Sequence, residues 1–322
     1  MNETLLEVKG LTKYFPVTKG LILAKVEGWV KAVDGVDFNI NKGETYGLVG
    51  ESGCGKTTTA KLILLLERVT AGSIYYGGRD ILTLKGKDLL GYRRAVQAVF
   101  QDPMSSLNPR MKVRDIISEP ILSTKSIPGE QVQDRIAECL EQVRLKPGDG
   151  ALYPHEFSGG QRQRIAVASA LAPSPELIVL DEPVSALDVS IRAQAMNLLK
   201  ELQEETGISY LMIAHDLAAV KYMSNRIGVM YLGKLVETAE SEELYSNPLH
   251  PYTKALFSAT LPSHPDVRRE RIILQGEVPS PLNPPSGCRF HPRCSQSIEV
   301  CSKDEPILED VGSNHQIACH NY

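Results

Sequence analysis

The sequence has no long hydrophobic run. No apolar stretch approaches the roughly 18–20 residues that span a bilayer, and the first ten residues, MNETLLEVKG, lack the basic stretch and apolar block of a signal peptide. We therefore expect a cytosolic protein whose association with a membrane depends on partners.

The sequence also lacks an excess of positive charge. Its 35 Lys and Arg residues stand against 39 Asp and Glu residues, so the formal net charge is −4. A general nucleic-acid binder would normally show a basic bias or stripe. The composition is otherwise that of an ordinary globular protein, and 322 residues are too many for one small domain, so we expect two domains.

Cysteine is sparse over most of the chain, where only Cys54 and Cys139 occur. In a reducing cytosol, a cluster of cysteines favours metal or catalytic chemistry over disulfides. Such a cluster is found near the C-terminus, in Cys288, Cys294, Cys301 and Cys319.

A strand, a glycine-rich turn and a helix follow one another around residue 50. The apolar run TYGLVG precedes GESGCGKTTTAKLILLLERV, whose second half has a helical composition. The turn matches G-x-x-x-x-G-K-[ST], in which backbone amides and the helix N-terminus surround phosphate oxygens. Lys56 is expected to reach the β- and γ-phosphates and Thr57 to ligate Mg²⁺, while Cys54 is a small filler. The residues assigned to nucleotide binding here are Gly50, Ser52, Gly53, Cys54, Gly55, Lys56, Thr57 and Thr58.

Two short apolar runs, ELIVLDEP and SYLMIAHD, are separated by the helical stretch IRAQAMNLLKELQEET. This alternation predicts an α/β fold with a parallel sheet. The first run ends in two carboxylates, of which Asp181 suits Mg²⁺ and Glu182 suits the base that orients the attacking water. A strand ending in Asp-Glu is often only a solvated turn, but a phosphate loop in the same chain favours the catalytic interpretation.

The segment FSGGQRQR, which begins at Phe157, resembles the signature motif of ATP-binding-cassette (ABC) proteins. Its polar residues stand at the start of a predicted helix, where amides and the helix dipole can hold an anion. The resemblance implies that they bind the γ-phosphate held by the opposite subunit, so that two subunits sandwich two ATP molecules head to tail. Phe157 replaces the Leu of many members. The residues assigned to this role are Ser158, Gly159, Gly160 and Gln161.

Other positions match further elements of the ABC family. Gln101 is similar to the Q-loop glutamine, which senses Mg²⁺ and the attacking water and links to the membrane subunits. The segment SALD, ending at Asp188, resembles the D-loop of the dimer interface, and His215 resembles the switch histidine that contacts the γ-phosphate. Phe15, with Tyr14 as the alternative, takes the place of the aromatic residue that stacks on adenine, although an aromatic ending a strand is as readily part of the core.

The four C-terminal cysteines can complete either a tetrahedral zinc site or a [4Fe–4S] cluster. The C-x2-C pairs of zinc ribbons are missing, while His291, His315 and His320 leave mixed Cys/His zinc binding open. The segment CRFHPRC (288–294), with the two later cysteines, resembles the C-terminal extension of oligopeptide/dipeptide-type ABC transporter ATPases. That resemblance implies a [4Fe–4S] cluster with a structural or redox-sensing role; zinc and unligated thiols are the alternatives.

The segments FQDPMSSLNPR (100–110) and NPLHPYT (247–253) indicate the same subfamily. An insert at 16–32 is similar to the second of the two ATPase subunits of such transporters, although it is also typical of a surface hairpin whose Trp29 packs locally or touches a partner. The resemblance implies a P-loop NTPase with an ABC-type nucleotide-binding domain at 1–260, including a helical subdomain at about 103–172. We expect a small, irregular, Cys-rich domain at 261–322.

The resemblance implies the ATP-hydrolysing motor of a binding-protein-dependent importer for di- or oligopeptides. The alternatives are an importer of the same subfamily for oligosaccharides or nickel, and a non-transport ABC ATPase acting on nucleic acid. The resemblance also implies partners: a paralogous second ATPase subunit, two membrane permease subunits and an extracytoplasmic substrate-binding protein. The expected location is the cytoplasmic face of the cell membrane, through the permease subunits.

Overall fold

The computed structural model describes residues 3–19, 25–101, 107–185, 187–259 and 272–322. Its contacts divide the chain into two compact units. The helical unit comprises residues 1–6, 40–45 and 75–214, and the phosphate-loop unit comprises residues 7–39, 46–74 and 215–322.

The helical unit is built on three parallel strands: β6 (Val96–Val99), β7 (Leu177–Asp181) and β8 (Ser209–Ile213). β7 pairs with β6 from Val96↔Leu177 and with β8 from Leu177↔Ser209. Every residue of β7 and β8 is buried, as expected for a parallel sheet that is covered on both faces. The predicted parallel sheet is therefore confirmed, and β7 carries its apolar run directly to Asp181.

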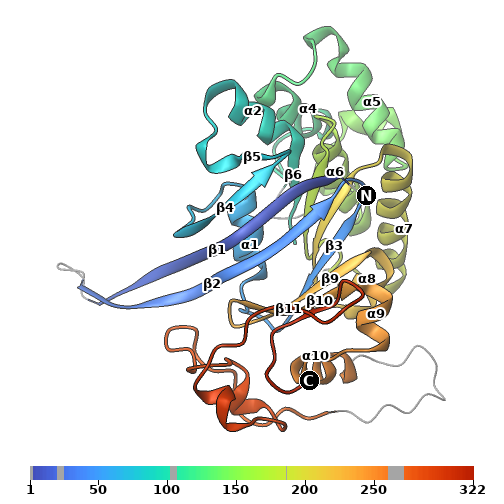
Figure 1. The fold of residues 1–322 in the computed structure, drawn as a ribbon. Coiled ribbons are helices and arrows are strands. Elements are labelled where there is room, and N and C mark those ends of the chain that lie inside the picture. The colour runs from blue at the N-terminus through green and yellow to red at the C-terminus, as the bar shows by residue number, and fades with distance from the viewer. Residues whose placement is uncertain (1–2, 20–24, 102–106, 186, 260–271) are drawn as a thin grey trace. The chain divides into compact units, whose positions relative to one another are not determined.

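Helices supply most of the rest of this unit, and α4, α5 and α6 pack against one another (Figure 1). α5 buries Val132, Ile136, Cys139 and Leu140, which recur at helical spacing on one face. These three helices fall within the predicted range 103–172, although that range itself stays a prediction. The helices of the unit are α2 (Gly86–Ala95), α4 (Val113–Thr124), α5 (Val132–Gln142), α6 (Gly159–Leu171) and α7 (Val189–Thr206), with short 3-10 turns at Ile81–Thr83, Gly129–Gln131, Pro147–Ala151 and Pro154–Glu156, and the short strand β5 (Arg79–Asp80).

The phosphate-loop unit contains most of two sheets. In one, β3 runs parallel to β9, β9 is antiparallel to β10, and β10 is antiparallel to β12, which also pairs with β11. In the other, β1 lies between β2 and β4. The strands are β1 (Thr4–Lys19), β2 (Lys25–Asn41), β3 (Thr45–Val49), β4 (Ala71–Tyr76), β9 (Arg226–Tyr231), β10 (Lys234–Glu240), β11 (Glu309–Asp310) and β12 (Gln316–Ile317).

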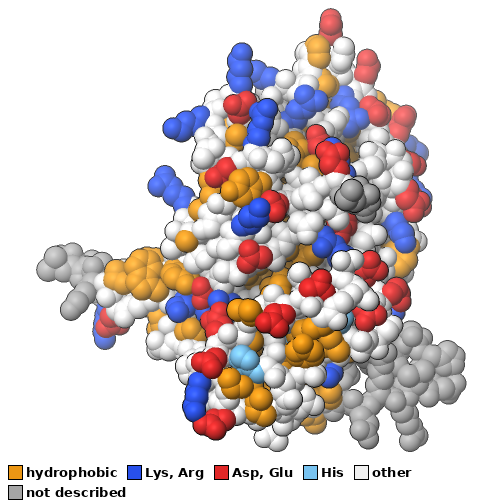
Figure 2. Space-filling model, in the orientation of Figure 1, with side chains coloured by type: hydrophobic (Ala, Val, Ile, Leu, Met, Phe, Trp, Pro, Cys, Tyr) orange, Lys and Arg blue, Asp and Glu red, His pale blue; other side chains and the backbone are white. Residues whose placement is uncertain are grey.

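The strands β1 and β2 are much longer than the others and run side by side (Figure 1). Hydrophobic side chains gather at their outer end (Figure 2), where Val26 and Trp29 are 45% and 49% exposed. Trp29 therefore does not pack in the core. Residues 20–24 of the predicted insert lie outside the described residues.

The helices of this unit are short: α1 (Lys56–Ile63), α8 (Leu217–Met223), α9 (Ser241–Ser246) and α10 (Pro251–Ser258). From residue 272 onward the chain is mainly turns, with 3-10 helices at His291–Arg293 and Glu299–Ser302. The domain boundary predicted near 260 lies outside the described residues. None of the helices in the described ranges is long and apolar enough to cross a membrane.

Candidate functional site

The phosphate loop connects β3 to α1. All five residues of β3 are buried, and the loop then turns through Gly50 and Gly55, whose φ angles are 150° and 116°. A Cβ atom at Gly50 would clash with the carbonyl oxygen of Met230, and one at Gly55 with the carbonyl oxygen of Ala32. Both positions need glycine because they combine a positive φ with close backbone approach.

Lys56 folds back over the phosphate loop. Its side-chain nitrogen Nζ donates to the carbonyl oxygens of Gly50 at 2.8 Å and Glu51 at 3.1 Å, and Lys56 is only 7% exposed. Burial raises the pKa of the Cys54 thiol, against the opposing effect of Lys56. A buried, protonated thiol is unreactive, which fits the predicted role of Cys54 as a filler.

Two contacts of the loop have no signal in the sequence. The backbone N–H of Glu51 donates to the Tyr252 hydroxyl at 2.8 Å, and the Glu51 carboxylate accepts two hydrogen bonds from Arg293. Tyr252 lies in the segment NPLHPYT and Arg293 in the segment CRFHPRC. Both segments indicate the subfamily, but nothing in either sequence indicates a contact with the phosphate loop.

In the helical unit, Gln101 and Glu182 come together at the C-terminal ends of β6 and β7. The Gln101 Nε2 donates to Glu182 Oε2 at 2.8 Å. Glu182 has a φ of 51°, which is uncommon for a residue other than glycine, and its N–H is held by the carbonyl of Ile213 at 2.8 Å. Asp181, at the end of β7, is 7% exposed. Backbone strain of this kind clusters at functional sites.

The signature segment begins α6 as predicted. The Ser158 hydroxyl accepts from the Gln161 N–H at 3.3 Å, and the Gln161 side-chain oxygen accepts from the Ser158 N–H at 3.0 Å. This reciprocal pair is a capping box. Phe157 is 6% exposed, so it fills an apolar position as leucine would. A Cβ at Gly160 would clash with Ile191, so this glycine lets the helix start lie close to α7.

The remaining predicted residues lie at the ends of elements. Asp188 directly precedes α7 and is exposed, and His215 is exposed just before α8. Phe15 is half-buried near the end of β1, with the Lys13 nitrogen 4.6 Å from its ring centre. Tyr14 donates to Asp34 Oδ1 at 2.5 Å, which favours Phe15 over Tyr14 for an adenine. Ala186 of the predicted D-loop and residues 102–106 lie outside the described residues.

The four C-terminal cysteines share one neighbourhood of the phosphate-loop unit. Burial raises the pKa of Cys288 to about 11, and Cys301, Cys319 and Cys294 raise it further through their charges. The Cys319 sulfur accepts from the Asn321 N–H at 3.4 Å. Backbone amides two residues further on also hydrogen-bond to Cys288 and Cys294.

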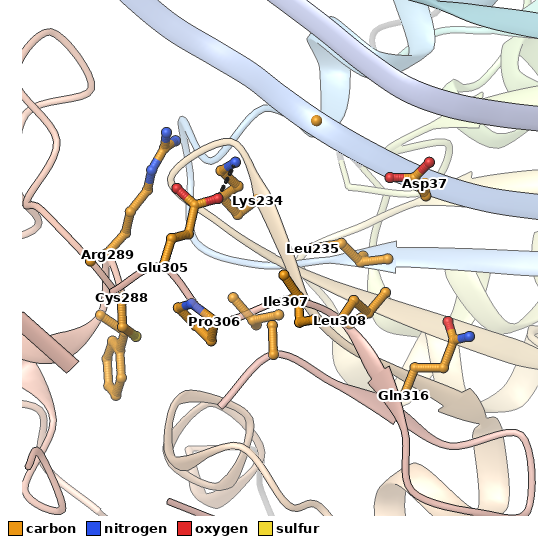
Figure 3. Close-up of a pocket in the computed structure, with 15 residues that line it drawn as sticks. Asp37, Lys234, Leu235, Cys288, Arg289, Glu305, Pro306, Ile307, Leu308 and Gln316 are labelled. Carbon is orange, nitrogen blue, oxygen red and sulfur yellow. Dashed lines mark ion pairs between the residues drawn. The ribbon is translucent and has the colours of Figure 1, made fainter. Parts of the chain in front are cut away.

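Cys288 also contributes to a cavity of about 370 Å³ in the phosphate-loop unit. Figure 3 shows Arg289 and the Lys234–Glu305 ion pair at one end of this cavity, with Asp37 and Gln316 at the other. Lys234 and Glu305 are 2.5 Å apart. Within the described ranges, no group of three or more His, Cys, Asp or Glu side chains could hold a metal ion.

Two protein families match this chain. The ABC transporter family matches residues 33–185, which include the phosphate loop, Gln101, the signature segment and Glu182. The family described as oligopeptide/dipeptide transporter, C-terminal region, matches residues 236–301, from β10 to Cys301.

Whole-length relatives and a solved structure agree with these matches. The oligopeptide transport ATP-binding protein AppF of Bacillus subtilis is 50% identical over 324 residues, covering 100% of this chain and 98% of that protein. The dipeptide transport ATP-binding protein DppF of Escherichia coli is 47% identical, covering 99% of this chain and 95% of its own. The ATP-binding cassette MJ0796, solved as a dimer in a post-hydrolysis state with ADP and Pi, is 29% identical with a TM-score of 0.63, covering 73% of this chain and 98% of that one. The chain therefore has the mixed α/β fold of an ABC ATPase and belongs to the ATP-binding proteins of the oligopeptide/dipeptide transporter family.

Proposed function

We propose that this ATPase drives the import of oligopeptides or dipeptides. The observation that carries the proposal is the whole-length match, at 50% and 47% identity, to two proteins named for oligopeptide and dipeptide transport. The match to the C-terminal region of the same family supports it, because that region lies beyond the segment matched by the general ABC transporter family.

The phosphate loop binds the phosphates of ATP through its backbone amides and Lys56. Lys56 already bridges two carbonyls across the loop, so it needs only a change of partner to reach a phosphate. The Thr57 hydroxyl and the Asp181 carboxylate offer the hard oxygen donors that Mg²⁺ prefers, and Gln101 adds an amide oxygen. Bound Mg²⁺ would neutralise charge on the β- and γ-phosphates.

Glu182 acts as the base that orients and deprotonates the attacking water. Its carboxylate accepts a hydrogen bond from the Gln101 amide. Gln101 therefore orients the side chain that receives the proton. The strained backbone at Glu182 is held by the hydrogen bond to Ile213, which aims the carboxylate in one direction. His215 contacts the γ-phosphate, and Phe15 stacks on adenine.

The ATPase works as a head-to-tail dimer under two membrane permease subunits. In that dimer, the start of α6 (Ser158, Gly159, Gly160 and Gln161) binds the γ-phosphate held by the other subunit, and Asp188 lies at the interface. The other subunit is a paralogous ATPase, and an extracytoplasmic binding protein delivers the peptide. These partners hold the chain at the cytoplasmic face of the membrane.

The test is to purify the full chain from detergent-extracted membranes of its own host through an affinity tag. We expect two integral membrane proteins and a second ATPase to copurify, and ATP hydrolysis to rise when a peptide-loaded binding protein is added. Hydrolysis that responds to a nickel- or oligosaccharide-loaded binding protein, and not to the peptide-loaded one, would contradict the assigned cargo.

We further propose that Cys288, Cys294, Cys301 and Cys319 hold a [4Fe–4S] cluster in a small Cys-rich domain. The support is that the four cysteines lie close enough to interact electrostatically and that backbone amides hydrogen-bond to three of the sulfurs, which opposes the effect of burial on their pKa. Four Cys thiolates are the ligand set of a [4Fe–4S] cluster, and the missing C-x2-C pairs disfavour a zinc ribbon.

Anaerobic purification of the full chain, with iron and sulfide analysis and visible absorption, tests this assignment. We expect four iron atoms per chain and a brown protein, with loss of colour in Cys288→Ser. A colourless protein that contains stoichiometric zinc, or no metal, would contradict the cluster assignment. The proposed ATPase function would not be affected by that result.

A further inference from the structure

The segment between Cys288 and Cys294 is anchored to the phosphate loop by a buried arginine. Arg293 Nη1 donates to Glu51 Oε2 at 2.8 Å, and its Nη2 donates to Glu51 Oε1 at 3.2 Å. The two side chains are 7% and 28% exposed. A bidentate ion pair of this kind fixes the relative orientation of the two side chains as well as pairing their charges. It joins residues that are 242 positions apart.

Aromatic side chains support the same contact. The Tyr231 hydroxyl accepts from Arg293 at 3.3 Å, and the Tyr252 hydroxyl accepts from the Glu51 backbone N–H at 2.8 Å. The rings of Tyr231 and Tyr252 lie 4.7 Å apart, and both pack against Phe290, which is 1% exposed. Glu51 is therefore held at its backbone and at its carboxylate by groups that pack on the C-terminal segment.

A second arginine of the segment, Arg289, supports the loop indirectly. Arg289 donates to the carboxylate of Asp34 and to the carbonyl oxygen of Leu232. The next residue, Gly233, donates its N–H to the Cys54 carbonyl at 2.8 Å. The C-terminal segment thus contacts the loop directly at Glu51 and, through the turn at 232–233, also supports Cys54.

Without a cationic partner, the negative charge of Glu51 would repel the phosphates of ATP. Glu51 occupies the second position of a loop that surrounds phosphate oxygens, and like charges at short range repel. Arg293 cancels this carboxylate. Arginine keeps its charge at every physiological pH, so Arg293 stays cationic against the Glu51 carboxylate that accepts its two hydrogen bonds.

We propose that Arg293 is a positioning residue for ATP binding: it fixes Glu51 and neutralises it, so that the C-terminal region sets the affinity of the phosphate loop for nucleotide. This proposal rests on the proposed role of the loop in binding ATP. It does not depend on which metal, if any, the cysteines hold.

The test compares Arg293→Met with a matched control, Lys303→Met, in the full chain. Lys303 belongs to the same region but forms an exposed pair with Glu299, with side chains 63% and 83% exposed. We expect Arg293→Met to raise both the Kd for a non-hydrolysable ATP analogue with Mg²⁺ and the KM for ATP about tenfold, which is about 1.4 kcal/mol. We expect kcat to stay within about twofold, because Arg293 acts on binding rather than on the chemical step. Lys303→Met should bind like the wild type.

Rescue by Glu51→Gln separates charge neutralisation from simple loosening. If Arg293 serves to cancel Glu51, the double variant with Glu51→Gln should recover to within about twofold of the wild-type Kd, because no uncompensated carboxylate is left. A Kd for Arg293→Met equal to that of the wild type would overturn the proposal. So would a double variant that binds as weakly as Arg293→Met alone.

Two further variants keep the test decisive. Should Arg293→Met fail to fold, Arg293→Lys keeps the charge without the bidentate geometry. We expect this variant to have a Kd for the ATP analogue about threefold above that of the wild type. An unchanged Kd would count against the proposal. Lys56→Ala reports on the loop itself. Loss of binding in Lys56→Ala with full binding in Arg293→Met removes only the present proposal, whereas full binding in Lys56→Ala contradicts the role given to the loop.

Discussion

The two units hold their candidate site residues by different means. In the phosphate-loop unit, the path of the loop depends on backbone geometry, because Gly50 and Gly55 stand where a Cβ would strike a carbonyl oxygen. In the helical unit, side-chain hydrogen bonds hold the site residues, as Gln101 holds Glu182 and Gln161 holds Ser158. We therefore expect added bulk at Gly50 or Gly55 to disturb the phosphate loop, and loss of a polar side chain at Gln101 or Gln161 to loosen Glu182 or Ser158.

If the proposed roles of these residues hold, this difference separates nucleotide binding from hydrolysis. Backbone amides offer many moderate contacts to phosphate oxygens, which contribute to affinity. A single carboxylate that takes a proton contributes to the rate. We therefore expect substitutions in the phosphate-loop unit to change Kd and those at Glu182 to change kcat.

The largest expected effect is that of Glu182→Gln, which keeps the shape of the side chain and removes the carboxylate that we propose as the base. We expect kcat to fall by about 10²–10⁴-fold, the usual worth of a positioned base, while the Kd for MgATP stays within about threefold. Single-turnover hydrolysis together with equilibrium binding measures both quantities. Hydrolysis at the wild-type rate would show that another group takes the proton.

Gly55→Ala should give the next largest effect, and it should appear in binding. The new Cβ would meet the Ala32 carbonyl at a φ of 116°, so the loop must move, and we expect MgATP affinity to fall at least about tenfold. Gly53→Ala is the matched control, because φ there is 79° but no described atom lies within 4 Å of the new Cβ. It should cost only the strain of one left-handed residue, about 1–2 kcal/mol of stability.

Equal losses of affinity in the two glycine variants would break the comparison. Backbone conformation alone would then govern the loop, and close approach to Ala32 would be irrelevant. Equilibrium binding and thermal unfolding of both variants, measured in parallel, distinguish the two causes.

Much of this arrangement could be predicted from the sequence because it is local. The buried run of β7 ends in Asp181 and Glu182 within a few residues, and the capping box at Ser158 and Gln161 is complete within one turn of helix. The glycines of the phosphate loop likewise follow from its motif.

Contacts between distant segments could not be predicted in this way. The pair Glu51–Arg293 joins the loop to the cysteine segment across 242 positions, and neither residue carries a local signal of its partner. The positive φ of Glu182 likewise could not be predicted from the sequence. The Glu182 N–H donates to the carbonyl oxygen of Ile213 on β8, a contact with another strand that no local pattern indicates.

The smallest expected effect is that of Ser158→Ala, which sharpens the comparison at a site held by side chains. The substitution removes the cap on the Gln161 N–H, and loss of an N-cap costs about 1 kcal/mol. We expect the amides in the first turn of α6 to exchange with deuterium about fivefold faster, while the phosphate loop is unaffected. Gln161→Ala is the control, since it removes only the reciprocal bond to the Ser158 N–H and should give a smaller increase. Unchanged exchange in Ser158→Ala would mean that backbone geometry, not the serine hydroxyl, holds this helix start, and the two units would then hold their sites in the same way.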